Sequence, residues 1–317
     1  MGALVAVTQT ADARAERFTV SEDRYRIVAY AALVTLTLII WTGAAVRLTG
    51  SGLGCSHWPN CEAGRVLPAL QGHALIEFGN RMVTGVVGLP CLLAAIGAFR
   101  LRPFRRDLVV PAVILPLGVL AQAVLGGLTV LFDLSWEMVI AHYLLSAALL
   151  VAAAVLVWRL RRGERAAREE NPRAVVFATR ALTAFGGYVV IAGTFATAAG
   201  PHAGGAGTGD YVARLDGLGA HTLRTLIHLH GHSATVMGIA AVGLWFAARR
   251  AGAGRLLMRA LTAVCIGMAI QGVVGLIQYH SALPSGLVWV HASLAAVLWI
   301  ALVFAFLAAG RPVRRVS

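Results

Sequence analysis

Eight stretches of apolar residues, each long enough to cross a lipid bilayer, alternate with polar segments along the chain. A helix rises about 1.5 Å per residue, so roughly 20 residues cross a hydrocarbon core of about 30 Å. The pattern predicts spanning helices near residues 27–47, 75–99, 108–131, 137–160, 174–198, 222–248, 256–279 and 285–309. The expected fold class is therefore an all-α membrane protein.

The sequence also repeats itself at a displacement of 149 or 150 residues. At 149, Gln122, Val124, Gly126, His142 and Leu149 align with Gln271, Val273, Gly275, His291 and Leu298. At 150, Gly43, Gly50, Gly54, Asn80 and Gly88 align with Gly193, Gly200, Gly204, His230 and Gly238. A repeat of this length indicates two copies of one structural unit. Four spans per copy give both copies the same orientation, which predicts two tandem four-helix bundles in a parallel repeat.

The charged segment RRGERAAREENPR separates the two copies and is the expected domain boundary. This places an N-terminal cytoplasmic segment at 1–26, the first bundle at 27–160, a cytoplasmic linker at 161–173, the second bundle at 174–309 and a cytoplasmic tail at 310–317.

Composition supports a membrane protein, because 58% of the residues are hydrophobic and only 13% are charged. The net charge of +13 comes from 27 arginines and no lysine, and 22 of these arginines flank the spans on one side. Such a bias predicts that both termini are cytoplasmic, and it explains the positive charge without a nucleic-acid partner. Residues 1–20 are polar, so no cleaved signal peptide is expected.

Two cysteines share the first outward loop, in the run GSGLGCSHWPNC. Outside the cytoplasmic membrane, Cys55 and Cys61 are expected to form a disulfide, although free thiols or a metal clip with His57 are alternatives. The second copy has the Gly-rich run HAGGAGTGD in the corresponding loop and no cysteine there. Cys91 and Cys265 lie in apolar spans and are expected to be small core residues.

A small set of polar residues lies in the outward halves of the spans: Arg47, Glu77, Asn80, Arg81, Gln122, His142, His228, His230, His232, Gln271 and His291. In the second copy, two of the histidines lie at similar depth on two helices of one bundle. That arrangement suits the two axial ligands of a porphyrin iron. A hydrogen bond from each imidazole to a neighbouring carbonyl is the simpler alternative.

The repeat selects His230 from the run HLHGHS, because Asn80 aligns with it and both are followed at the same spacing by an aligned glycine. His228 and His232 are two residues away, about 200° around a helix, and face elsewhere. Neighbouring glycines would admit a flat ligand, or they could serve close helix packing.

The first copy has Asn80 in place of the second histidine, with Glu77 on the same helix face and Arg81 beside it. A carboxylate at membrane depth is a candidate functional group, or else an ion-pair partner for Arg81 or Arg47. One copy could thus saturate an iron for electron transfer, while the other leaves an iron face or ring edge free for chemistry.

The runs VRLTGSGLGCSHWPNC and IEFGNRMVTG, with histidines in the fourth and eighth spans, resemble the heme A synthase family over residues 27–309. The resemblance implies a membrane enzyme that oxidises the C8 methyl of heme O to the formyl group of heme A by successive hydroxylation. It implies heme b held by His230 and His291, and substrate heme O in the first copy. Heme O synthase and cytochrome oxidase assembly factors become expected partners in the plasma membrane.

Carried over to this chain, the resemblance makes His142 an axial ligand of the substrate heme, Asn80 and Arg81 further substrate heme-binding residues and Glu77 the essential carboxylate. Cys55 and Cys61 match the family's extracellular disulfide pair. Many members have histidine where this chain has Asn80. The substrate iron could therefore be five-coordinate, bind Asn80 weakly or draw His73, which is more readily explained as a loop or headgroup residue.

Two other functions fit the pattern in part. A diheme cytochrome b-type electron carrier would also use histidine pairs in four-helix bundles, but Asn80 and the outward cysteines suit a substrate site better. A transporter with a parallel repeat would have broken helices at matching places. Pro90, Pro111 and Pro116 do not match between the copies.

Overall fold

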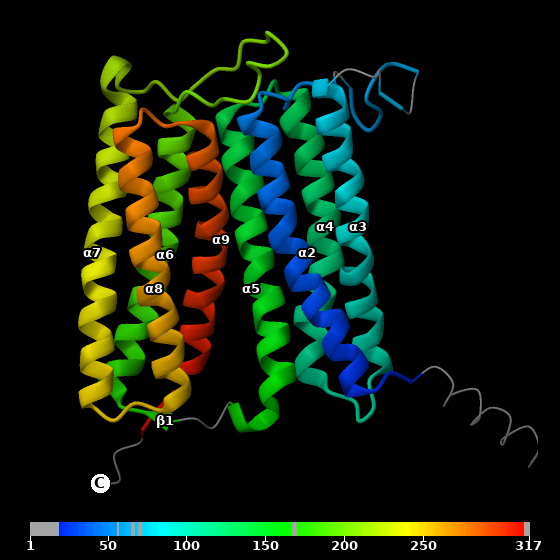
Figure 1. Cartoon of the computed structure of the whole chain (residues 1–317). Helices are drawn as coiled ribbons and strands as arrows, with labels where there is room; N and C mark the ends of the chain where they lie inside the picture. The colour runs from blue at the N-terminus through cyan, green and yellow to red at the C-terminus, as the bar shows by residue number, and fades with distance from the viewer. Residues whose placement is uncertain (1–18, 56, 65–66, 69–71, 167–169, 314–317) are drawn as a thin grey trace, which may run out of the picture.

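The computed structural model describes residues 19–55, 57–64, 67–68, 72–166 and 170–313. Within these residues, eight helices are long and apolar enough to cross a membrane. Their bounds are α2 Glu22–Leu48, α3 Gly72–Arg100, α4 Arg106–Leu131, α5 Trp136–Ala166, α6 Arg173–Ala199, α7 Thr222–Arg250, α8 Arg255–His280 and α9 Ser285–Ala308. The prediction of an all-α, eight-span membrane protein is confirmed (Figure 1).

The helices extend a little beyond the apolar stretches. Seven predicted spans lie wholly inside one helix, and the eighth ends one residue past α9. The largest extension is at α5, which continues past residue 160 to Ala166, so the expected linker begins as helix. Arginine, glutamate and alanine all favour helix, so the backbone can stay helical where the apolar stretch stops. Charge therefore ends the hydrophobic stretch before it ends the helix.

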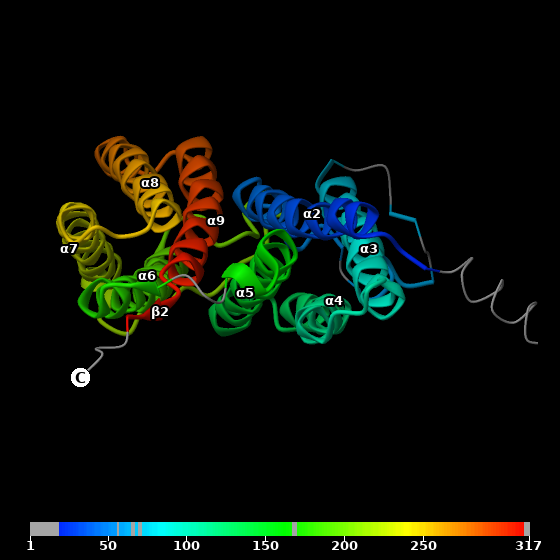
Figure 2. The ribbon, with the colours of Figure 1, turned by 90° about the horizontal axis from the view of Figure 1, so that it is seen from below.

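The helices form two groups. Helices α2–α5 pack with one another, and helices α6–α9 pack with one another, while α9 also lies against α2 and α5 (Figure 2). The first group buries a core that includes Tyr25, Leu108 and Leu156. The second buries a separate core that includes Met237 and Leu261. Each group thus has its own hydrophobic interior.

The two groups share matched helix contacts at the displacement seen in the sequence. A Cβ added at Gly118 of α4 would meet Leu149 of α5, and one at Gly267 of α8 would meet Leu298 of α9. Glycine at these positions allows the neighbouring helix to come close, as in other membrane bundles. The repeated sequence therefore corresponds to repeated packing.

One short sheet and one 3-10 turn complete the regular structure of the described chain. Strand β1 (Glu170–Asn171) pairs in parallel with β2 (Arg311–Pro312), and η1 (Gly219–His221) precedes α7. The buried Asn171 side chain donates to the carbonyls of Ala308 and Ala309 and accepts from the amide of Gly254 at 2.8 Å. This asparagine ties the segment between the bundles to the end of α9. Residues 1–18 of the expected N-terminal segment and 314–317 of the expected tail lie outside the described residues.

The two long loops at the other end of the bundles contact each other (Figure 1). Gly52 donates to the carbonyl of Gly204 at 2.9 Å, and Gly207 donates to the carbonyl of Gly50 at 3.1 Å. Gly50 has a φ of +69°, and a Cβ there would overlap the backbone of Gly207. Only glycine suits both that conformation and that approach. The Gly-rich loop of the second copy is thus a packing surface for the first.

Candidate functional site

Two histidines face each other inside the second bundle. His230 of α7 and His291 of α9 have ring centroids 6.2 Å apart and ring planes at 81°. Both rings are partly buried among the helices. The structure therefore brings together the two residues that the repeat selected.

His230 is fixed by its own neighbours. Its Nδ1 lies 3.1 Å from the carbonyl oxygen of Val189 on α6. A carbonyl only accepts, so Nδ1 carries the proton and the lone pair is left on Nε2. A Cβ added at Gly193, also on α6, would lie 2.9 Å from Cε1 of the ring. Such an orienting bond to a backbone carbonyl is typical of a metal-binding imidazole.

His291 is held in a different way. Gln271 of α8 donates from Nε2 to the backbone carbonyl of His291 at 2.9 Å, which fixes the helix rather than the ring. A Cβ added at Gly275 would lie 3.1 Å from Cε1 of the ring. Nδ1 of His291 is buried and has no hydrogen-bond partner among the described residues. No protein atom among the described residues is therefore hydrogen-bonded to this nitrogen.

The spacing of the two rings fits an iron between them. An imidazole nitrogen binds a first-row metal ion at about 2 Å and lies about 1 Å from its ring centre, so two axial rings have centres roughly 6 Å apart. The observed 6.2 Å agrees with this value. Among the described residues there is no group of three or more histidine, cysteine or acidic side chains that could hold a metal ion. A porphyrin needs only the two axial ligands, since it supplies the other four.

The first bundle repeats half of this arrangement. Gln122 of α4 donates to the carbonyl of His142 on α5 at 3.0 Å, and a Cβ added at Gly126 would lie 3.2 Å from Cε1 of that ring. Nδ1 of His142 is likewise buried without a partner among the described residues. These contacts copy those of Gln271, Gly275 and His291. The sequence pattern aligned the glutamines but did not indicate what they do.

The other half of the first bundle differs. Asn80 of α3 accepts a hydrogen bond from the hydroxyl of Thr42 on α2 at 2.7 Å. A Cβ added at Gly43, the counterpart of Gly193, would meet nothing within 4 Å. The Asn80 side chain is thus hydrogen-bonded to α2. Near this position, the first bundle has more space beside Gly43 than the second bundle has beside Gly193, which contacts the His230 ring.

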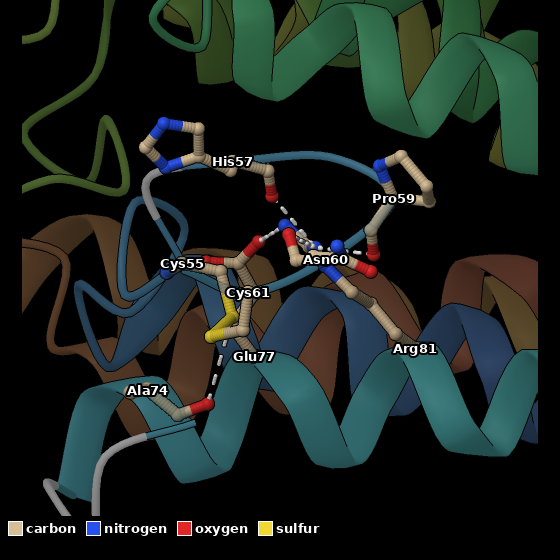
Figure 3. The surroundings of a disulfide bond; sticks show 8 residues. All are labelled: Cys55, His57, Pro59, Asn60, Cys61, Ala74, Glu77 and Arg81. Carbon is tan, nitrogen blue, oxygen red and sulfur yellow. Dashed lines mark hydrogen bonds and ion pairs between the residues drawn. A yellow bond between two sulfur atoms is a disulfide. The ribbon is translucent and has the colours of Figure 1, made fainter. Parts of the chain in front are cut away.

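Glu77 and Arg81 hold the disulfide loop against α3 (Figure 3). Glu77 is 6% exposed, and its two oxygens have separate partners. Oε2 accepts from the amide of Cys55 at 2.7 Å, and Oε1 pairs with Arg81 at 2.5 Å. Of the two ion-pair partners considered for Glu77, Arg81 is the one observed. The carboxylate is therefore part of a buried, charge-assisted clamp.

Arg81 continues the clamp into the loop. Its Nη1 donates to the carbonyls of His57, Pro59 and Asn60 at 2.9, 3.3 and 3.1 Å. Cys55 and Cys61 form the expected disulfide, and both are fully buried against Ala74 and Phe78 (Figure 3). The prediction of this disulfide is confirmed. Arg81 points toward the loop backbone and donates three hydrogen bonds to it.

Trp58 of the same loop rests on α4, and sequence reasoning missed it. The ring carbons Cδ2 and Cε2 lie 2.5 and 2.6 Å from the point that a Cβ at Gly127 would occupy. Gly127 follows Gly126, which faces His142. The repeat offers a signal in retrospect, because the second copy has Leu276 at the place of Gly127 and no cysteine loop. The disulfide loop thus packs against both the N-terminal part of α3 and the C-terminal part of α4.

The remaining histidines lie away from these pairs. Nδ1 of His73, at the start of α3, hydrogen-bonds the hydroxyl of Ser51 at 2.8 Å, and the ring lies where a Cβ at Gly207 would be. The rings of His228 and His232 have centroids 5.7 Å apart and are tilted by 36°, and His228 has an edge contact with Tyr279 of α8. His73 therefore lies in the first turn of α3 and not in a loop, although its ring contacts loop residues.

Comparison with known families decides where this arrangement belongs. A family model described as cytochrome oxidase assembly protein, COX15-CtaA, matches residues 26–303, which include all eight spanning helices almost in full. The chain belongs to this family. The matched range contains the His230–His291 pair, His142 and the disulfide loop, so the geometry above is that of a family member.

The chain is also similar to individual proteins that are named heme A synthase. The chain is 31% identical over 138 residues to the heme A synthase of Lysinibacillus sphaericus, covering 42% of this chain and 45% of that protein. It is 31% identical over 147 residues to that of Geobacillus thermodenitrificans, with 46% of each covered. For that of Shouchella clausii the identity is 34% over 155 residues, with 48% and 49% covered. The chain thus spans about half the length of the curated relatives it matches.

Proposed function

We propose that this protein is a heme A synthase, which oxidises the C8 methyl of heme O to a formyl group. Family membership and the named relatives support the reaction. The observation that carries the proposal is the asymmetry of the two bundles. One bundle has two facing imidazoles, and the other has one imidazole and, at the position equivalent to His230, an asparagine bonded to Thr42. A bundle with two imidazoles suits a resident heme, and a bundle with one leaves a coordination position of the substrate iron open.

In the second bundle, His230 and His291 would hold heme b as axial ligands. When bound, heme b supplies one-electron transfer, because an iron with two imidazoles has no free coordination position. The Val189 carbonyl keeps the proton on Nδ1 of His230 and presents Nε2. Gly193 and Gly275 leave room for the rings to lie against α6 and α8.

In the first bundle, His142 would bind the iron of heme O, with Asn80 and Arg81 near the substrate. The contacts of His142 copy those of His291, which supports the same ligand role. Asn80 is engaged by Thr42, and Arg81 by the loop, so neither needs to reach the iron. Two hydroxylations of the methyl, each a two-electron oxidation by an external oxidant that also requires a source of oxygen, would give a geminal diol, and loss of water would give the formyl group.

Glu77 is the proposed catalytic carboxylate. Hydroxylation of a methyl on the porphyrin edge develops positive charge or releases a proton, and a carboxylate can stabilise the first or accept the second. Both oxygens of Glu77 also hold the Cys55 amide and Arg81, so the same residue positions the loop. The two roles separate in the variants described in the Discussion.

The protein would act in the plasma membrane, with both termini cytoplasmic and the disulfide loop extracellular. The arginine bias supports that orientation. An enzyme that consumes heme O would act after heme O synthase and before assembly of cytochrome oxidase. Both are partners that this function implies.

Pigment extraction tests the function. Cells carrying the gene together with a source of heme O should accumulate heme A, and cells carrying the His142→Ala variant should accumulate heme O instead. Separation of acid-extracted hemes by chromatography measures both. If the wild-type chain retains bound heme b and yields no heme A, it is a cytochrome b-type electron carrier, and the proposed activity is wrong.

A further inference from the structure

The two bundles meet along a seam between α2 and α9, where tryptophans of one bundle bond to the backbone of the other. Trp41 of α2 donates from Nε1 to the carbonyl of Ser293 on α9 at 3.2 Å. In return, Trp289 of α9 donates from Nε1 to the carbonyl of Trp41 at 2.8 Å. The two bonds form a reciprocal clamp between helices that are about 250 residues apart in the sequence.

The clamp brackets a proposed heme ligand. Trp289 and Ser293 are four residues apart, so they share one face of α9. His291 lies midway between them, about 200° around the helix, and points to the other side, toward His230. A helix held on one face has its opposite face fixed as well. The rotation of the His291 ring therefore depends on a residue of the first bundle.

The neighbouring residue of α2 serves the other site. Thr42 donates to Asn80, the residue that stands where the first bundle would have its second imidazole. Two consecutive residues of one helix thus contact the helix that carries His291 and the ligand position of the first bundle. Helix α2 thus contacts a helix of each candidate site, α9 in the second bundle and α3 in the first.

We propose that Trp41 is a positioning residue for the heme b site, so that the first bundle completes the cofactor site of the second. The inference rests on the proposed function, because it assumes that His291 ligates heme b. Residues that orient a ligating histidine tune the metal it binds without touching it. Loss of the clamp should therefore change the electronic properties of the heme before it changes heme occupancy.

Three substitutions in the full-length protein separate this role from general loosening of the seam. Trp41→Phe removes the donor to Ser293, and Trp289→Phe removes the donor to Trp41. Trp299→Phe is the matched control, because Trp299 also joins α9 to the first bundle, through the carbonyl of Ala147 at 3.0 Å. It lies two turns from His291. All three changes keep an aromatic ring and remove one indole hydrogen bond.

Electron paramagnetic resonance and redox titration of the purified holoprotein provide readouts besides activity. We expect Trp41→Phe and Trp289→Phe to shift the g values of the low-spin ferric heme and its midpoint potential in the same direction, with heme-to-protein ratio retained. Trp299→Phe should leave both close to wild type. This result would support a positioning role specific to the clamp.

Two results would overturn the inference. The first is unchanged g values and potential in both Trp41→Phe and Trp289→Phe. The second is an equal shift in Trp299→Phe, which would indicate only a weakened seam. Neither result affects the proposed function, because wild-type protein would still contain low-spin heme b. Conversely, a wild-type protein without that signal would refute the ligand assignment before any variant is compared.

Discussion

Glu77 illustrates how one side chain can serve both structure and chemistry. Its carboxylate is buried, one oxygen accepts the Cys55 amide, and the other pairs with Arg81. A buried carboxylate needs such partners, since an unpaired charge away from water is costly. Sequence position and the family resemblance selected Glu77, but they did not indicate that it holds the disulfide loop. That contact joins residues 22 positions apart and depends on the fold of the loop.

Substitution of Glu77 and of its ion-pair partner Arg81 distinguishes the two roles of Glu77. Glu77→Gln should retain heme b but lower heme A formation by about 100-fold, the typical contribution of a general base. Arg81→Gln breaks the same ion pair and leaves the carboxylate in place, so its loss should be clearly smaller. Heme A yield per bound heme b, measured from membranes, compares the two. Equal losses would mean that Glu77 acts only by positioning the loop.

The histidine positions are the part of the site that could be predicted from the sequence. His142 and His291 align in the repeat, and their structural contacts with Gln122 and Gln271 are the same to within 0.1 Å. The disulfide was also predicted, because two cysteines six residues apart share one loop, and the structure decides against the free thiols or metal clip that the sequence left open. Thr42 and Trp58 were not predicted, since their partners are set by which side chains meet between helices. Hydrophobic periodicity does not contain that information.

At the scale of elements, the disulfide loop is held at both ends. The Glu77–Arg81 pair joins the loop to α3, and Trp58 packs on α4 where Gly127 leaves space. In the second bundle, the glycine is replaced by Leu276, and the corresponding loop packs on the first loop instead. The two copies therefore share their helices and differ where the outer loops meet the helix ends. Loops commonly carry the differences between duplicated units.

A glycine-to-alanine pair tests the seat of Trp58. Gly127→Ala should lower stability by about 1–3 kcal/mol, because the new Cβ would lie 2.5 Å from the indole ring. Gly243→Ala is the matched control, since a Cβ there would meet nothing within 4 Å. It should be neutral or stabilising by up to about 1 kcal/mol, because alanine favours helix. Thermal unfolding in detergent, followed by circular dichroism, compares the two.

A double-mutant cycle identifies the cause of that loss. In a Trp58→Ala background, Gly127→Ala should no longer destabilise the protein, because the clashing ring is absent. If Gly127→Ala is equally harmful with and without Trp58, the loop does not rest on this glycine.

At the scale of the whole molecule, the two bundles are not independent. Indole hydrogen bonds cross the seam from Trp41, Trp289 and Trp299. Backbone hydrogen bonds between glycines also join the two long loops. The eight spans and the repeat could be predicted from hydropathy and self-alignment, because those properties are local or periodic. The seam could not, since nothing in the spacing of α2 and α9 shows which faces meet. Bundles held at a fixed distance would suit electron transfer between the proposed heme b and the proposed substrate heme.

The most direct measurement is the absorption spectrum of the purified full-length protein, expressed with ample porphyrin supply. We expect a low-spin, two-imidazole heme b signal that is lost in both His230→Ala and His291→Ala and retained in His142→Ala. A colourless wild-type protein would contradict the account, as would a heme b signal that survives removal of either His230 or His291.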